Sequence, residues 1–84
     1  MRGKNLKLQN ELREFRKECL SNTTGSIITK RDLYNHYVKW AEKKGYGADT
    51  INSFSLYIQT YAQFMIEKQL KSGRIRVWLN VSLI

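Results

Sequence analysis

The sequence has little of what a disulfide-bonded or metal-binding protein needs. Its 84 residues include one cysteine, Cys19, and no proline. One cysteine cannot form an intramolecular disulfide, so nothing here indicates an oxidising compartment, and no metal-ligand cluster accompanies it. Cys19 falls on the apolar stripe of a predicted helix, where we expect a small core residue. We therefore predict a cytoplasmic protein with no cofactor and no metal.

Long apolar runs and catalytic motifs are also missing. The chain begins Met-Arg-Gly-Lys-Asn and runs into charged sequence without an apolar signal core, so we expect neither export nor a membrane partner. Neither Gly-x-x-x-x-Gly-Lys-Ser/Thr nor Gly-x-Ser-x-Gly occurs. Asp32 and His36 have an i,i+4 spacing that could orient an imidazole for base catalysis, but a surface charge pair is the simpler interpretation. We expect no enzymatic activity.

Acidic residues are few, at seven against fifteen lysines and arginines, which gives a net charge of +8. The apolar share of 42% is ordinary for a folded globule and too high for a disordered basic tail. A chain of this length has room for one core, so residues 1–84 are predicted to form a single domain. Charge of this sign favours a phosphate polymer or an anionic surface as partner, and nucleic acid is the stronger prediction.

Helical periodicity accounts for the first two thirds of the chain. A first helix is predicted over about residues 5–20, with Leu8, Leu12, Phe15 and Cys19 on one face and a solvated face of mixed charge elsewhere. Residues 21–26 are predicted to be a loop, followed by a short strand at 27–28. A capping pattern from Thr29 to Asp32 begins a second helix over about residues 30–43, and Gly45 ends it.

A third helix follows the turn at residues 46–48. Asp49, Thr50 or Asn52 could cap it, and its apolar face begins with Ile51, Phe54 and Ile58. Ser53, Ser55 and Gln59 are expected on its outer surface. The helical pattern gives way to a strand pattern between Tyr61 and Phe64.

The last seventeen residues predict a basic β-hairpin. Residues 68–84 contain four cations and no acid, around a Ser72-Gly73 turn. In the second run, Ile75, Val77, Leu79, Val81 and Leu83 take every other position, which predicts a strand with one apolar face. Strict alternation places Trp78 with Arg74 and Arg76 on the opposite face. The complete order predicts an α+β fold, a winged helix with three helices and a C-terminal β-hairpin wing.

Several of these segments resemble a known family. Three motifs carry the likeness: Leu33-Tyr34-x-x-Tyr37-x-x-Trp40 within the run from Thr29 to Gly45, the following Ser53-Phe54, and Arg74-x-Arg76-x-Trp78-x-Asn-Val-x-Leu83. Together they look like the C-terminal winged-helix domain of phage- and plasmid-type primase-helicases related to the poxvirus replicative helicase. The likeness covers about residues 12–84. It implies a non-catalytic module that serves replication of a phage, plasmid or genomic island, with a helicase, primase or polymerase of the same element as possible partner.

The chain departs from that family pattern at two places. Asn80 stands where the family commonly has glycine. No lysine or arginine occurs between Gly45 and Glu67, so the predicted recognition helix has no cation. Since arginine is the usual reader of guanine, weak sequence preference and backbone-dominated binding are expected, and single-stranded DNA is a possible ligand.

The predicted DNA contacts come from both ends of the fold. Trp78 could stack an unpaired base, or it could pack beneath the first helix, which the family likeness favours. Two other functions stay open: a dimeric transcription regulator that reads a duplex operator, and an adaptor that binds another replication protein. The complete set of predicted contacts is Lys30, Arg31, Lys39, Lys43, Lys44, Ser53, Ser55, Gln59, Lys68, Lys71, Arg74, Arg76 and Trp78.

Overall fold

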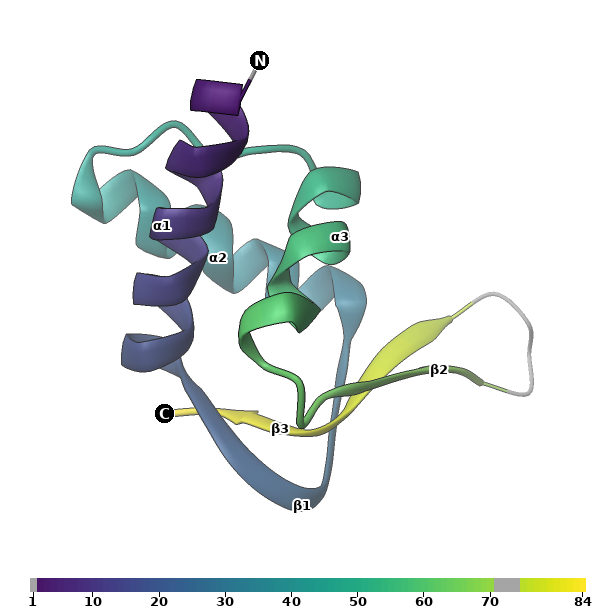
Figure 1. The fold of residues 1–84 in the computed structure, drawn as a ribbon. Helices are drawn as coiled ribbons and strands as arrows, with labels where there is room; N and C mark the ends of the chain where they lie inside the picture. The colour runs from purple at the N-terminus through teal and green to yellow at the C-terminus, as the bar shows by residue number, and fades with distance from the viewer. Residues whose placement is uncertain (1, 71–74) are drawn as a thin grey trace.

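Three helices pack on one side of a three-stranded antiparallel sheet, which makes this an α+β fold (Figure 1). The computed structural model describes residues 2–70 and 75–84, with side chains from residue 7 onward. The arrangement is compatible with the predicted winged helix. The elements are, in order, α1 (Arg2–Cys19), β1 (Leu20–Thr29), α2 (Lys30–Lys44), α3 (Ile51–Tyr61), β2 (Ile66–Gln69) and β3 (Arg76–Leu83).

The ends of α2 and α3 follow from local sequence signals. The Thr29 hydroxyl oxygen accepts a hydrogen bond from the backbone N–H of Asp32 at 3.0 Å, so the predicted cap is confirmed. Gly45 ends α2 with a φ of 80°, a conformation that glycine adopts without strain. Of the three candidate caps for the third helix, Thr50 is the one in place, and it accepts from the N–H of Ser53 at 3.2 Å.

The predicted apolar stripes of the three helices meet in one core. Leu12, Phe15, Tyr37 and Phe54 are completely buried, and Cys19 is buried as expected. Rings of Tyr37 and Phe54 stack with their centroids 4.6 Å apart, and Phe15 meets both edge-on. These contacts tie the helices together.

Glu11 is an exception to the solvated face predicted for α1. Its side chain is 6% exposed, and burial, the largest cause, raises the pKa of its carboxyl. The expectation that the acids of this helix all lie in solvent is therefore wrong for Glu11.

Residues 21–26 form part of a strand, so the predicted loop is wrong. β1 pairs with β3 from Leu20 opposite Leu83 to Thr29 opposite Val77. The register shifts in the middle, where residues 23–26 of β1 face Asn80 alone. The strand order of the sheet is β1-β3-β2, so β1 is an edge strand, and polar side chains suit such a strand.

Asn80 makes this shift possible. Its φ of 69° lies in the left-handed region, and its side-chain oxygen accepts a hydrogen bond from the N–H of Gly25 at 3.1 Å. The irregularity changes the alternation of β3, so Trp78 and Val81 both face the core. The single apolar face predicted for residues 75–83 is therefore wrong.

Trp78 is 1% exposed and lies in the core. The position opposite the apolar face, which strict alternation gave, is wrong, because the face that Trp78 shares with Arg76 is the one turned toward the helices. The alternative of an interior position, which the family likeness favoured, is the one observed. On the other face, Leu79 lies between Ile27 of β1 and Ile66 of β2, and the side chains of Ile27 and Ile66 are 54% and 52% exposed.

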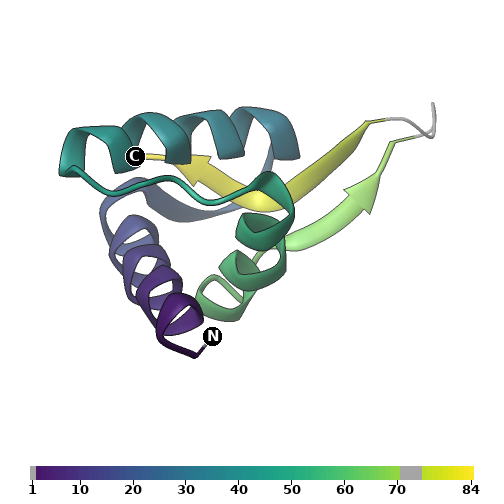
Figure 2. The same ribbon diagram turned by 90° about the horizontal axis from the view of Figure 1, so that it is seen from above.

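The hairpin of β2 and β3 projects away from the helices (Figure 2). The backbone N–H of Leu70 donates to the carbonyl of Ile75 at 2.9 Å, which extends the pairing of the predicted hairpin beyond β2. At the other end, the N–H of Ile84 donates to the carbonyl of Cys19. In the part of the chain that the structure describes, no helix combines the length and apolarity that crossing a membrane requires.

Candidate nucleic-acid interface

A groove of about 770 Å³ lies where the start of α2, the outer face of α3 and one side of the hairpin meet. It brings together segments that are far apart in sequence. The start of α2 contributes residues 29–31, α3 contributes residues at 51, 52, 55, 56 and 59, and the hairpin contributes Glu67, Ile75 and Arg76.

The α3 side of the groove is a single helical stripe. Asn52, Ser55, Leu56 and Gln59 line it at i, i+3, i+4 and i+7. Ser55 and Gln59 were predicted contacts, whereas Asn52 and Leu56 were missed, although the same spacing would have found them. Leu56 is 68% exposed. Ser53 was also predicted, but it does not line the groove.

Three cations border the groove, and two of them share one carboxylate. The Lys30 ammonium lies 3.0 Å from Oε2 of Glu67, and the Arg76 guanidinium lies 3.3 Å from the same oxygen. The hydrogen bond from Lys30 is the main cause that lowers the pKa of Glu67, so this carboxyl stays ionised at neutral pH. Arg31 is exposed and makes no ion pair among the described residues.

Lys30 also lies over the indole of Trp78, with its ammonium 5.1 Å from the ring centroid. Trp78 is therefore covered, and the predicted stacking of a base on it does not fit this structure. Its Nε1 is buried and has no hydrogen-bond partner in the described part of the chain. Sequence reasoning missed Glu67, the acid that joins Lys30 to the hairpin.

Lys68 lies on the opposite side of the hairpin from the groove. It pairs with Val77, one position away from the Glu67–Trp78 pair, so its side chain points to the other face of the sheet. The predicted contacts Lys71 and Arg74, with the turn between them, lie outside the described residues.

The predicted lysines of α2 do not form one set with Lys30 and Arg31. Lys43 is twelve residues beyond Arg31, about 18 Å along the helix axis. Lys39 and Lys43 are exposed and do not line the groove. Lys39 and Lys43 therefore lie away from the groove, and their contact with DNA stays a prediction.

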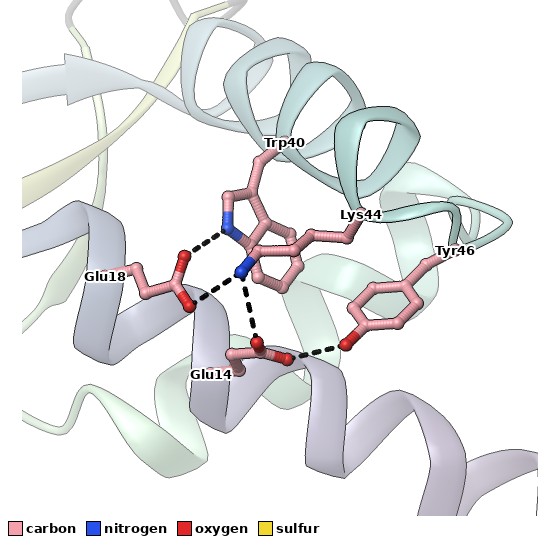
Figure 3. A network of polar contacts seen from close by, with 5 residues as sticks. All are labelled: Glu14, Glu18, Trp40, Lys44 and Tyr46. Atoms are coloured by element: carbon pink, nitrogen blue, oxygen red, sulfur yellow. Dashed lines mark hydrogen bonds and ion pairs between the residues drawn. The ribbon is translucent and has the colours of Figure 1, made fainter.

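Lys44 takes part in a polar network that joins α2 to α1 (Figure 3). Its ammonium lies 3.0 Å from Glu18 and 3.3 Å from Glu14. Trp40 donates its indole N–H to Glu18 at 3.0 Å, and the Tyr46 hydroxyl donates to Glu14 at 2.8 Å. The bond from Trp40, followed by the bond from Lys44, lowers the pKa of Glu18. This network holds two helices together and leaves Lys44 poorly placed to contact phosphate.

No group of three or more His, Cys, Asp or Glu side chains in residues 7–70 and 75–84 is arranged to hold a metal ion. His36 lies on α2 with its ring 6.1 Å from that of Phe15. The groove bordered by cations is the candidate site.

Comparisons with protein-family models, curated proteins and solved structures found no match to this chain.

Proposed function

We propose that this chain is a non-catalytic winged-helix DNA-binding module that holds DNA mainly through its phosphates. One observation supports the proposal best: the groove brings cations from the start of α2 and from the hairpin together beside the exposed stripe of α3. In a winged helix, α2 and α3 form the helix-turn-helix and the hairpin forms the wing. Cations at the rim of such a groove hold the phosphate backbone and fix the position of the protein on DNA.

Duplex DNA fits this arrangement better than a single strand does. A major groove about 12 Å wide admits an α-helix, and α3 presents eleven residues with an uncharged outer stripe. Binding to a single strand depends on exposed aromatic rings, and Trp78, the ring considered for that role, is buried.

The setting of the module rests on its sequence resemblance alone. The motifs shared with phage- and plasmid-type primase-helicases support a role in replication of a mobile genetic element. A helicase, primase or polymerase of that element is the corresponding protein partner. Asn80 fits this resemblance, because glycine and asparagine are the two residues that best tolerate its positive φ.

A matched pair of double variants tests the proposal. Arg31→Ala with Arg76→Ala removes two charges at the groove, and Lys39→Ala with Lys43→Ala removes two charges from the distal part of α2. Fluorescence anisotropy is measured with labelled duplex and single-stranded DNA of equal length at two salt concentrations. We expect the groove variant to lose about tenfold or more in duplex affinity and the salt slope to fall by about two, as for two lost phosphate contacts.

The control variant separates site binding from general attraction. Both double variants have the same net charge, so a bulk charge effect lowers affinity equally in each. Equal losses would contradict the groove as the binding site. Absence of binding to either DNA at low salt would contradict the proposed function.

A second candidate, a protein-binding adaptor, is favoured by the row of Ile27, Leu79 and Ile66 on the open face of the sheet. Two of these side chains are more than half exposed. Under this function the same titration shows no DNA binding at either salt concentration. Ile66→Lys, which interrupts the row, distinguishes the two functions further, since DNA binding through the groove should not depend on it.

A further inference from the structure

The stripe of α3 that faces the groove is uncharged, although the protein as a whole is strongly basic. Its side chains are two amides, one hydroxyl and one exposed leucine. We propose that this stripe reads A·T base pairs in the major groove of duplex DNA. The inference rests on the proposed function and adds a base preference to the phosphate binding described above.

Asn52 and Gln59 suit adenine better than guanine. The major-groove edge of adenine offers one acceptor, N7, and one donor, the N6 amino group, which a side-chain amide matches with its N–H and its oxygen. Guanine offers two acceptors, N7 and O6, and arginine or lysine is the usual match. Residues Ile51–Tyr61 contain neither. The stripe therefore lacks the side chains that favour guanine and has those that favour adenine.

The amide of Gln59 is held in one orientation. Its Nε2 donates to the backbone carbonyl of Met65 at 2.9 Å, just before β2 begins. That bond uses one N–H and leaves the second N–H and the side-chain oxygen for a base. A fixed amide loses less conformational entropy on binding than a free one. Gln59 is thus prepared to offer one donor and one acceptor together.

Leu56 supplies the contact for the other base of the pair. It lies between Asn52 and Gln59 on the stripe and is 68% exposed, so its methyl groups are available to a surface that covers the groove. Thymine presents a C5-methyl group in the major groove, and apolar side chains recognise it. Cytosine has no such methyl group, so Leu56 and the amides favour the same base pair.

The test uses duplexes that differ only in the central bases. Their cores are A·T-rich, G·C-rich, A·T-rich with uracil in place of thymine, and A·T-rich with 7-deazaadenine, which lacks the N7 acceptor. The proteins are the unmodified chain, Leu56→Ala, Gln59→Ala and the control Thr60→Ala. Thr60 is exposed on α3 and does not line the groove.

We expect the A·T core to bind about fivefold or more tightly than the G·C core, the lower range for one bidentate contact. Loss of the thymine methyl should weaken binding of the unmodified chain by up to about fourfold, the value of one buried methyl group. This weakening by uracil should vanish in Leu56→Ala. The loss caused by 7-deazaadenine should become smaller in Gln59→Ala, where Asn52 remains, and Thr60→Ala should behave like the unmodified chain.

Each other outcome has a distinct meaning. Salt-sensitive binding with equal affinity for all four duplexes overturns the inference and leaves the proposed function standing. An A·T preference that neither Leu56→Ala nor Gln59→Ala changes also overturns it, because the preference then comes from DNA shape. No binding to any duplex overturns both.

Discussion

Glu67 determines how much positive charge the groove can offer to a phosphate. Its carboxylate holds Lys30 and Arg76 at 3.0 and 3.3 Å, and among the described lining residues it is the one acid. A phosphate that binds either cation must compete with this carboxylate. Partial exposure of Glu67 makes each ion pair worth roughly 1 kcal/mol or less, so it is a modest restraint that phosphate can replace.

Replacing Glu67 should therefore tighten DNA binding. In Glu67→Gln, Lys30 and Arg76 lose their shared carboxylate and become free for phosphate, so we expect duplex affinity to rise about three- to tenfold at low salt, with a steeper salt dependence. Fluorescence anisotropy at several salt concentrations measures both. Glu42→Gln is the control, since Glu42 is an exposed acid on α2 that does not line the groove. If both variants gain equally, the effect is one of net charge.

At the scale of the element, β3 depends on the backbone of a single residue. Asn80 adopts a positive φ and bonds Gly25 across the irregular part of the β1–β3 ladder. This conformation turns Val81 to the core beside Trp78. A residue that resists it strains the strand or shifts the register, and a shifted register moves apolar side chains to the wrong face.

Two substitutions separate the backbone requirement of Asn80 from its hydrogen bond. We expect Asn80→Ala to lower the free energy of unfolding by about 1–2 kcal/mol, because alanine tolerates positive φ poorly and the bond to Gly25 is lost. Asn80→Gly loses the bond but keeps the backbone freedom, so its cost should stay below about 1 kcal/mol. Urea unfolding followed by tryptophan fluorescence measures the difference. Equal losses would assign the effect to the hydrogen bond alone.

The helices were predictable from sequence because their signals are local. Thr29 and Gly45 lie at the ends of α2, and the spacing of Leu12 and Phe15 is enough to identify the buried face of α1. The sheet was less predictable because a strand's face depends on its partner. Residues 21–26 look like a loop in the sequence, and β1 is a strand because residues 20–22 and 27–29, on either side of the irregularity, pair with β3.

The groove was predictable only in part for the same reason. Ser55, Gln59 and Arg76 were identified by residue type and expected position. Glu67 was missed, because its role depends on the fold bringing Lys30 next to the hairpin. Strict alternation placed Trp78 on the wrong face, because the positive φ of Asn80 cannot be read from it, whereas the family likeness favoured the interior position that is observed.

For the whole molecule, three glutamate carboxyl groups whose pKa values change on folding link stability to pH. The pKa of Glu18 is lowered by the bond from Trp40 and then by Lys44, and the pKa of Glu67 is lowered chiefly by Lys30. Folding therefore favours the ionised form of both. Their contribution is complete above the ordinary carboxyl value of 4.5 and is lost as pH falls through the lowered values. Glu11, whose pKa is raised, acts in the opposite direction: its contribution is present below 4.5 and lost as pH rises.

We expect the protein to lose stability below about pH 4.5 and Glu18→Gln to reduce that pH dependence. Glutamine can still accept the Trp40 hydrogen bond, but it gives Lys44 no opposite charge. The variant should be less stable than the unmodified chain at pH 7 and closer to it at pH 3. Urea titrations across this range measure the change. An unchanged dependence of stability on pH would show that the network between α1 and α2 does not stabilise the fold. Glu42→Gln again serves as the exposed control.

The strand order has a consequence for how the chain acquires its structure during synthesis. β3 is translated after every other element, yet it lies between β1 and β2, which have no ladder without it. A nascent chain that has emerged only as far as Gln69 carries all three helices but lacks Trp78 and Val81 from its core. The helices cannot complete their core without β3, so we expect folding to be completed only after residues 76–83 have left the ribosome.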